Sequence, residues 1–256
     1  MCQSSPEPKG NARIMCDSPL NLPAKEAWNT ASHAYNADRP DVVASVSFGP
    51  LCPPDNELRL LGDLAGSAVL DVGCGGGQNA VCLAMQGASV TALDISERQM
   101  EHARRAAAAR SDAKIYFVLG GAETLTGIPD RSQDLVMAAN VMPFVECVDQ
   151  ALTSCRRVLK PGGRLVLSMD HPFRSCFIDV EAASMTNYPE RDYFSRVSRT
   201  WPLKETTAYV TSFDRTVGEW VHLIHAAGLT LIRLLEPPVP DDVLDDLYPA
   251  DGALAS

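Results

Sequence analysis

The chain has 256 residues, 46% of them hydrophobic, which is enough to bury the core of one large domain. Its formal net charge of −10 disfavours nucleic acid as a partner, because few basic residues would have to neutralise many phosphates. No apolar stretch reaches the roughly 18 residues of a membrane span, and the first residues lack the apolar segment of a signal peptide. We therefore expect a cytoplasmic protein without a membrane partner.

The eight cysteines are scattered through the chain and form no CxxC pair. In a chain of this size the pattern predicts reduced, mostly buried thiols. It favours neither a disulfide framework nor a metal site.

The N-terminal part contains two segments of different character. Residues 1–22 have no apolar period and are expected to form a mobile arm, so that residues 23–256 form a single domain. Residues 24–37 contain helix formers and place Trp28 and Tyr35 on one face. That face suits packing on the core and a role at a ligand site equally well.

From residue 68 onward, apolar strand-like segments alternate with helical ones. The expected strands are residues 68–72, 89–94, 114–120, 134–139, 164–169 and 229–235, and the expected helices are residues 57–64, 79–86, 97–109, 148–159 and 216–227. Because most of these strands are apolar throughout, they predict a parallel sheet that is buried on both faces. The fold class is therefore α/β, a Rossmann-like doubly wound, mostly parallel sheet with helices on both faces. Ser96, three residues before Gln99, predicts a capping box at the start of the helix that follows the second strand.

Residues 172–213 interrupt this alternation and hold half of the aromatic side chains of the chain. Aromatic side chains can enclose an apolar small molecule and exclude water. We expect this insertion to cover a substrate, with Phe173 and Phe177 in contact with it and with Trp28 and Tyr35 closing the other side. The alternative is that about half of these aromatics form a satellite core.

The first expected strand leads into a glycine-rich loop in the sequence VLDVGCGGG. In an open parallel sheet, ligands bind at the carboxyl ends of the strands, and glycines there let the backbone approach the ligand. The start of the following helix attracts an anion, which can be a pyrophosphate or an amino-acid carboxylate. Gly75, Gly77 and Ala80 also fit the GxGxxA pattern of dinucleotide sites, so an NAD(P)-dependent oxidoreductase stays open as an alternative.

Two acidic residues favour a different ligand. Asp71, inside the first strand, would repel a pyrophosphate but would attract an ammonium or sulfonium group. Asp94, at the end of the second strand, can accept hydrogen bonds from both hydroxyls of a ribose. Together they describe a nucleoside joined to a zwitterionic amino acid.

Five motifs, VLDVGCGGG, VTALDIS, GGAETL, SQDLV and LKPGGRLVLSMDHPF, follow one another in an order and spacing that resembles the class I S-adenosylmethionine-dependent methyltransferases. The resemblance runs from about Trp28 to Pro237 and implies S-adenosylmethionine as the cofactor, with S-adenosylhomocysteine as its product. It also implies a role for individual residues: Asp71 and the backbone of Gly73 and Gly75 at the methionine portion, Asp94 at the ribose, Ile95 on one adenine face, and Ala122 and Glu123 beside the adenine.

The chain departs from the family pattern in two places. Gly121 stands where the family often has an Asp that accepts a hydrogen bond from the adenine amino group. Either Glu123 or a water replaces that contact, or the cofactor binds somewhat more weakly. No last antiparallel strand is evident after Glu236, so the sequence is either truncated or completes its sheet in another way.

Methyl transfer from a sulfonium is an in-line displacement that depends on alignment in a water-poor pocket. His171, with Asp170 beside it, is the best candidate for a general base, because both follow the fifth expected strand. The alternative is that His171 shapes the pocket or bonds to the backbone. Asn140 ends the fourth strand, where it contacts cofactor or substrate or caps the strand, and the sequence NVMPF lacks the adjacent prolines found in nucleobase methyltransferases.

These features resemble methyltransferases that modify small ring-containing metabolites on oxygen or nitrogen, including those of antibiotic and other secondary metabolism. A non-catalytic S-adenosylmethionine-binding module is a further alternative. The sequence leaves the oligomeric state open, with a homodimer as one alternative.

Overall fold

The computed structural model describes residues 22–37, 43–110, 112–179, 184–196, 198–203, 206–241 and 243. The expected N-terminal arm, apart from Leu22, lies outside these residues. No helix among the described residues is long and apolar enough to cross a membrane.

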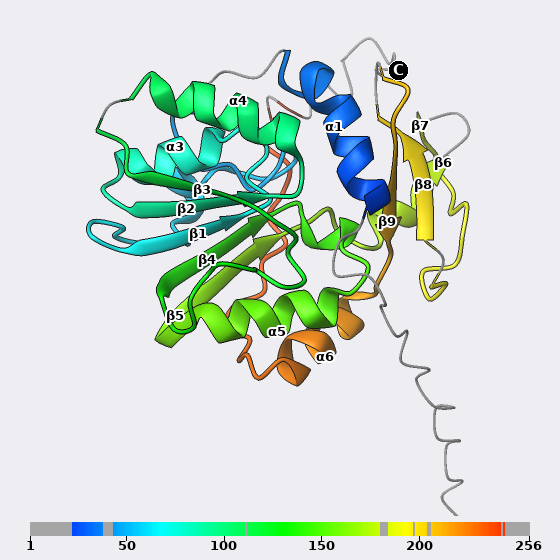
Figure 1. The fold of residues 1–256 in the computed structure, drawn as a ribbon. Helices are drawn as coiled ribbons and strands as arrows, with labels where there is room; N and C mark the ends of the chain where they lie inside the picture. The colour runs from blue at the N-terminus through cyan, green and yellow to red at the C-terminus, as the bar shows by residue number, and fades with distance from the viewer. Residues whose placement is uncertain are drawn as a thin grey trace, which may run out of the picture.

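The centre of the molecule is a sheet of five parallel strands in the order β3-β2-β1-β4-β5 (Figure 1). The strands are β1 (Ala68–Val72), β2 (Ser89–Asp94), β3 (Ile115–Leu119), β4 (Gln133–Ala139) and β5 (Leu159–Ser168). The chain runs outward from β1 to β3 and then returns to the other side of β1. The order of the strands therefore reverses between β1 and β4, which is where such a sheet binds ligands. The predicted fold class is confirmed.

Helices cover both faces of the sheet (Figure 1), with α3 (Gln78–Met85) and α4 (Glu97–Ala108) on one face and α5 (Val148–Val158) and α6 (Val217–Ala226) on the other. Successive strand residues point to opposite faces. Val69 accordingly belongs to the core beneath α3 and α4, and its neighbour Leu70 to the core beneath α5 and α6. Burial on both faces of the sheet explains why apolar and polar residues do not alternate along these strands.

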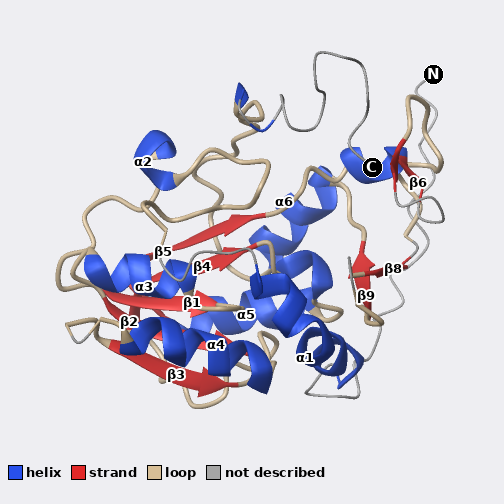
Figure 2. Cartoon of the chain, turned by 90° about the horizontal axis from the view of Figure 1, so that it is seen from above, coloured by secondary structure: helices blue, strands red, loops and turns tan. Residues whose placement is uncertain are grey.

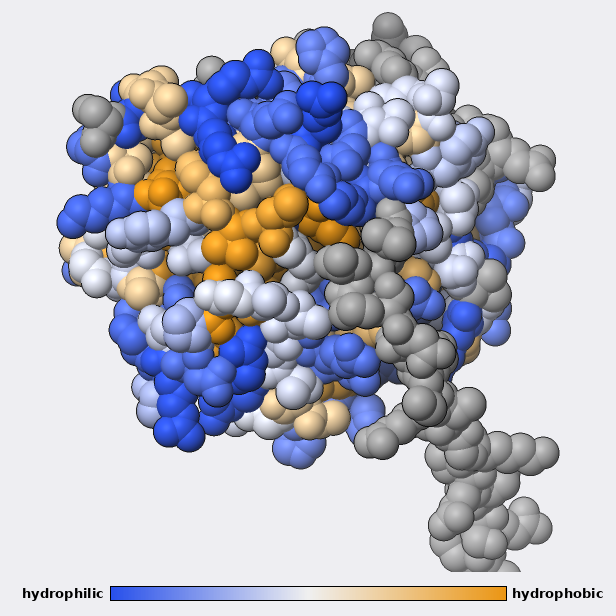
Figure 3. Space-filling model, viewed as in Figure 1, coloured by the Kyte–Doolittle hydropathy of each residue, from blue (hydrophilic) through white to orange (hydrophobic). Residues whose placement is uncertain are grey.

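Figure 3 shows an apolar area of surface between the more polar surfaces of α4 and α5.

Two helix starts are fixed by side chains. Ser96 Oγ accepts a hydrogen bond from Gln99 N at 3.1 Å and caps α4 as predicted. The reciprocal bond differs, because Ser96 N donates to Asp94 Oδ1 rather than to Gln99. A complete capping box opens α6, where Thr216 and Glu219 exchange side-chain and backbone hydrogen bonds.

The helix expected at residues 57–64 is wrong in position and length. The structure has a single turn, α2 (Asp55–Leu58), which ends at Arg59 in the left-handed region with φ 51°. Asp55 Oδ1 then accepts hydrogen bonds from the N–H groups of Leu60 and Leu61, which holds the chain in a turn.

The strand expected at residues 229–235 is also wrong, because these residues form no strand in the structure. A strand needs a neighbour for its backbone N–H and C=O groups, and residues 229–235 do not pair with β5, the edge strand of the described sheet. Ile232 is 80% exposed as a result. Most of the residues after Glu236, where the sequence shows no evident last strand, lie outside the described residues.

The rest of the described chain lies beside the sheet. It comprises α1 (Leu22–Ala37), the 3₁₀ turns η1 (Met142–Phe144) and η2 (Arg174–Phe177), the short pair β6 (Ile178–Asp179) and β7 (Ser184–Met185), and the hairpin β8 (Ser198–Pro202) and β9 (Tyr209–Phe213). Figure 2 shows α1 and β9 beside each other, beyond the carboxyl ends of the strands. Ala27 and Ala31 of α1 pack on Ala208 in a small core of their own.

The cysteines differ in one respect from the expectation of reduced thiols. Cys52, Cys74, Cys82, Cys155 and Cys176 are free. Cys147 is disulfide-bonded.

Candidate functional site

The glycine loop between β1 and α3 contains positions that have no room for a side chain. Gly73 has a φ of 66°, and a Cβ there would lie 2.4 Å from Val141 Cγ2. Gly77, the N-cap of α3, has a φ of 86°, and a Cβ there would lie 2.8 Å from the Cα of Ala103. Both positions require glycine on steric and conformational grounds. The loop therefore lies close to Val141 and Ala103, and without side chains at these positions its backbone can face a ligand.

Asp94 holds this loop against the end of β2. Its Oδ2 accepts a hydrogen bond from Gly75 N and its Oδ1 one from Ser96 N, both at 2.9 Å. The side chain is only 7% exposed, and burial raises the pKa of its carboxyl while the backbone hydrogen bonds from Ser96 and Gly75 lower it. The two carboxylate oxygens together have about four lone pairs, so acceptor capacity remains for a ligand hydroxyl.

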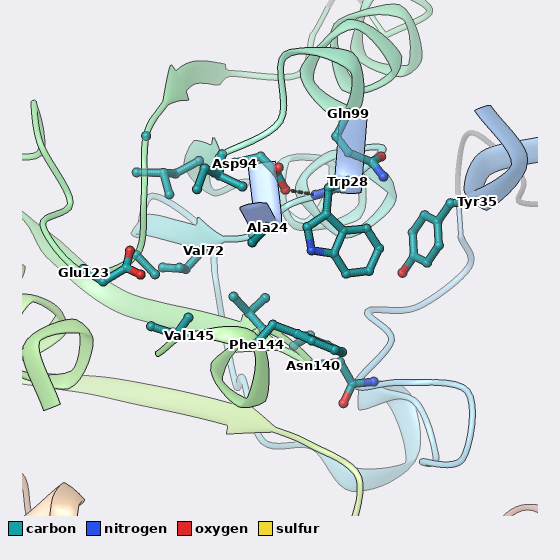
Figure 4. A pocket seen from close by; sticks show the side chains of 18 residues that line it. Ala24, Trp28, Tyr35, Val72, Asp94, Gln99, Glu123, Asn140, Phe144 and Val145 are labelled. Atoms are coloured by element: carbon teal, nitrogen blue, oxygen red, sulfur yellow. Dashed lines mark hydrogen bonds between the residues drawn. The ribbon is translucent and has the colours of Figure 1, made fainter. Parts of the chain in front are cut away.

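A cleft opens at the carboxyl ends of the strands (Figure 4). It holds about 770 Å³ of empty space, part of which is open to solvent. Its lining consists of Ala24, Trp28, Tyr35, Val72, Gly73, Gly75, Leu93, Asp94, Ile95, Gln99, Gly120, Ala122, Glu123, Ala139, Asn140, Val141, Phe144 and Val145.

Aromatic side chains from two elements form one wall of the cleft. The ring of Trp28, on α1, meets the ring of Tyr35 at 5.4 Å between centroids and that of Phe144, on η1, at 5.7 Å, edge to face in both cases. Figure 4 shows Trp28 beside Tyr35 and above Phe144. Such a wall suits an apolar, ring-containing ligand.

Helix α1 is fixed over the cleft mainly by polar contacts. Asn29 Oδ1 accepts hydrogen bonds from Ser96 Oγ at 2.7 Å and from Arg98 N at 3.1 Å, so it adds a second cap to α4. Asn36 Nδ2 donates to Gln99 Oε1 at 2.8 Å. The N-terminal helix is thereby attached to the same turn that follows Asp94.

Comparison with known proteins identifies the domain that carries this cleft. Residues 70–167 match a family model described as a methyltransferase domain. The chain carries a class I S-adenosylmethionine-dependent methyltransferase domain. This match favours the nucleoside interpretation of the glycine loop over the dinucleotide alternative.

Individual relatives agree with the family match. A ubiquinone biosynthesis O-methyltransferase of Xanthomonas oryzae pv. oryzae is 37% identical over 106 residues, which are 41% of this chain and 44% of the relative. An S-adenosyl-L-methionine-dependent Diels-Alderase, iccD, of Talaromyces variabilis is 38% identical over 116 residues, 43% of this chain and 40% of that protein. The match thus spans less than half the length of either relative. The crystal structure of an S-adenosylmethionine-dependent methyltransferase from Mesorhizobium loti covers 75% of this chain and 87% of its own, with 25% identity and a TM-score of 0.60.

The residues present suit S-adenosylmethionine as the cofactor of the methyltransferase domain. The loop at Gly73 leaves no room for a side chain, the buried Asp94 offers free lone pairs to a ribose, and Ile95 adds an apolar surface. Ala122 and Glu123 follow β3 on the side expected for an adenine and are each 7% exposed. Burial raises the pKa of the Glu123 carboxyl, with a smaller effect from the charge of Glu146.

The structure brings most of the predicted residues to the cleft. Of the predicted cofactor and substrate residues, the lining includes Gly73, Gly75, Asp94, Ile95, Ala122, Glu123, Asn140, Trp28 and Tyr35. Phe144 and Gln99 also lie there and were not predicted as site residues. The position of Phe144 just after the fourth strand was a usable signal, whereas nothing in the sequence connected Gln99 to Asn36.

Asn140 occupies a constrained position at the end of β4. It has a φ of 55°, which asparagine tolerates better than most residues. Its N–H donates to Ser168 O at 3.0 Å and so caps the strand. The side chain borders the cleft on one side and Gly49 on the other, where a Cβ would lie 2.3 Å from Asn140 Nδ2.

Asp71 does not line the cleft. It lies in β1 beneath the loop, 2% exposed, and its Oδ2 has no hydrogen-bond partner in the part of the chain that the structure describes. Burial, followed by the charge of Asp94, raises the pKa of the Asp71 carboxyl to about 8. At neutral pH the group is therefore mostly protonated, and a positive charge bound nearby would favour its ionised form.

The four residues expected next to β5 and in the insertion also lie outside the lining. His171 Nε2 lies 2.6 Å from Glu236 Oε1, and the His171 side chain is 44% exposed. Asp170 forms an ion pair with Arg174 at 3.4 Å. The rings of Phe173 and Phe177 pack on each other at 5.3 Å between centroids, in the satellite cluster that the sequence left open. The geometry gives no support to a catalytic His171.

Proposed function

We propose that this protein transfers a methyl group from S-adenosylmethionine to a hydroxyl or amine of a small ring-containing metabolite. The observation that carries the proposal is one continuous cleft that joins Asp94, Ile95 and Glu123 to the aromatic wall of Trp28 and Phe144. One half suits a nucleoside and the other an apolar ring. The name of the Xanthomonas relative, an O-methyltransferase, favours oxygen as the acceptor atom.

The proposed cofactor contacts follow from the lining. Asp94 would accept the ribose hydroxyls, Ile95 would pack on the adenine, and Ala122 and Glu123 would border its edge. The backbone at Gly73 and Gly75 would hold the methionine portion, with the Asp71 carboxyl beneath it. Gly121 stands where the family often has an Asp that accepts a hydrogen bond from the adenine amino group. Glu123 would take over this role, because within the described residues it is the only carboxyl in the lining besides Asp94.

The cofactor supplies an electrophilic methyl group, so the protein must chiefly align the acceptor and exclude water. Trp28, Tyr35 and Phe144 are placed to do both, because they wall the cleft with rings whose positions fix one another. His171 and Asp170 could serve as a base only after a movement of the segment around them. Phe173 and Phe177 would act as part of a substrate cover. The proposal also includes a place in secondary metabolism, such as antibiotic biosynthesis, and a cytoplasmic location.

Calorimetric titration with S-adenosylmethionine, S-adenosylhomocysteine and NADH tests the binding part. We expect the two sulfur ligands to bind and NADH to fail. The variant Asp94→Ala should lose binding, and Asp112→Ala, which removes an exposed aspartate, should keep it. Preference for NADH, or full affinity in Asp94→Ala, would reject the assignment.

A second function is favoured by one relative, the Diels-Alderase whose name states S-adenosylmethionine dependence without methyl transfer. Under this alternative the protein binds the cofactor and acts on an enclosed substrate in another way. Incubation with methyl-labelled S-adenosylmethionine and a panel of phenols and aromatic amines separates the two. Labelled product supports methyl transfer, and cofactor binding without label in any acceptor supports the alternative.

A further inference from the structure

Two arginines share one carboxylate at the base of the β8–β9 hairpin. Arg199 Nε and Nη2 donate to the two oxygens of Asp214 at 2.8 and 3.1 Å, and Arg191 Nη2 lies 2.5 Å from the same carboxylate. The three side chains are 9%, 16% and 18% exposed for Arg199, Asp214 and Arg191. The cluster therefore carries one more positive than negative charge in a nearly water-free place.

Several donors at this cluster are buried without a partner. Among the described residues, Arg199 Nη1, Arg191 Nη1, Trp201 Nε1 and Ser212 Oγ are shielded from solvent and form no hydrogen bond. The bond to Asp214 uses the Nε and Nη2 side of the Arg199 guanidinium, so Nη1 points away from that carboxylate. The guanidinium also lies over the Trp201 ring, 4.8 Å from its centroid.

The hairpin register places three of these residues on one face. Arg199 is paired with Ser212 across the two antiparallel strands. Trp201 is two residues from Arg199 on the same strand, and residues two apart share a face. Buried donors in native proteins nearly always have acceptors. Unpaired donors on one hairpin face beside a net positive charge match an acceptor-only anion, and a carboxylate offers two such oxygens.

The hairpin is connected to the wall of the cleft. Arg215, the residue after Asp214, donates from Nη2 to Val145 O at 3.3 Å and to Glu146 O at 2.9 Å, and Val145 lines the cleft. At the other end of β9, Ala208 packs with Ala27 of α1. The cluster thus belongs to the elements that surround the aromatic wall, and Figure 1 shows β9 next to α1.

We propose that the β8–β9 hairpin binds a carboxylate carried by the methyl acceptor, with Arg199, Trp201 and Ser212 as its donors and Arg191 completing the charge. The identity of the ligand as an acceptor rests on the proposed function, whereas the carboxylate site rests on the cluster alone. Because the donors are shielded, the bound carboxylate is enclosed, and the hairpin must move to admit it. The substrate class is then an aromatic or other cyclic acid rather than a neutral ring.

Benzoate and benzamide test this site, because they have the same shape and differ in charge. Each is titrated into the full chain by calorimetry, with and without saturating S-adenosylhomocysteine. We expect benzoate to bind at least about tenfold more tightly than benzamide. Arg199→Met should abolish this preference, and Trp201→Phe and Ser212→Ala, which each remove one donor with little change in packing, should reduce it. Arg233→Met, which removes an exposed arginine elsewhere, should leave it unchanged.

Equal affinity for the two probes, absence of benzoate binding, or full preference in both Trp201→Phe and Ser212→Ala would overturn the proposal. Thermal unfolding of each variant shows whether a loss reflects folding, and the two mild variants keep the test valid if Arg199→Met does not fold. A benzoate preference without S-adenosylhomocysteine binding would reject the proposed function and leave the site standing. S-adenosylhomocysteine binding without a benzoate preference would reject the carboxylate site and leave the proposed function standing.

Discussion

The carboxylate of Asp94 and the backbone N–H of Gly75 are joined by a 2.9 Å hydrogen bond, although the two residues are 19 positions apart in the chain. The acid proposed to bind the ribose is thus also the group that shapes the glycine loop. A change at Asp94 therefore affects the ligand directly and the loop indirectly. The two effects can be separated by measuring binding and stability together.

Asp94→Asn should weaken S-adenosylhomocysteine binding by about tenfold or more and lower the free energy of unfolding by about 1 to 3 kcal/mol. An amide has one acceptor oxygen and one donor nitrogen, so it cannot accept from both Gly75 N and Ser96 N. Calorimetry and denaturant unfolding report the two effects. Asp112→Asn is the control, and unchanged stability in Asp94→Asn would show that the loop does not depend on this contact.

Gly73→Ala should destabilise the protein by about 1 to 3 kcal/mol, because it combines a positive φ with a clash against Val141. The second change Val141→Ala removes the clash and leaves the backbone strain. A double-mutant cycle should therefore show partial rescue by about 1 kcal/mol. Purely additive effects would mean that the loop moves away from Val141 at no cost.

The sheet could be predicted from the sequence because its strands are apolar on both faces and each is followed by a helix with recognisable end signals. The same reasoning placed Asp94 at the ligand-binding edge, since the carboxyl ends of parallel strands meet there. The resemblance to the methyltransferase family added Ile95 and Glu123 to this part of the site.

What could not be predicted depends on contacts between distant segments. The apolar period of residues 229–235 suits a strand, but these residues pair with no strand of the described sheet, not even with its edge strand β5. His171 follows β5 as expected, yet its side chain is directed to Glu236. The cap that Asn29 adds to α4 joins residues 67 positions apart, and no sequence pattern announces it.

Asn29→Ala tests how firmly α1 is attached. Loss of its hydrogen bonds to Ser96 Oγ and Arg98 N should cost about 1 kcal/mol, the usual value of a helix cap, and should increase the hydrogen exchange of α1. Thr30→Ala, at an exposed neighbouring position, is the matched control. Identical exchange of α1 in both variants would show that its contact with Ala208 suffices.

Asp71 predicts a pH dependence of stability. Its folded pKa of about 8 lies above the ordinary value of 3.8, so between these values the folded state holds a proton that the unfolded state has released. Stability is therefore highest below the unfolded pKa and falls as the pH rises toward 8.

In the ligand-free protein Asp71→Asn should remove this fall and raise the free energy of unfolding at pH 7 by about 1 to a few kcal/mol. If Asp71 supports the methionine portion of the cofactor, the same variant should weaken S-adenosylhomocysteine binding, since the amide cannot ionise. Denaturant unfolding between about pH 5 and pH 8, within the range that the two pKa values span, provides the measurement. A wild-type stability that rises over this range, or that Asp71→Asn leaves unchanged, would contradict the buried, protonated state of this carboxyl.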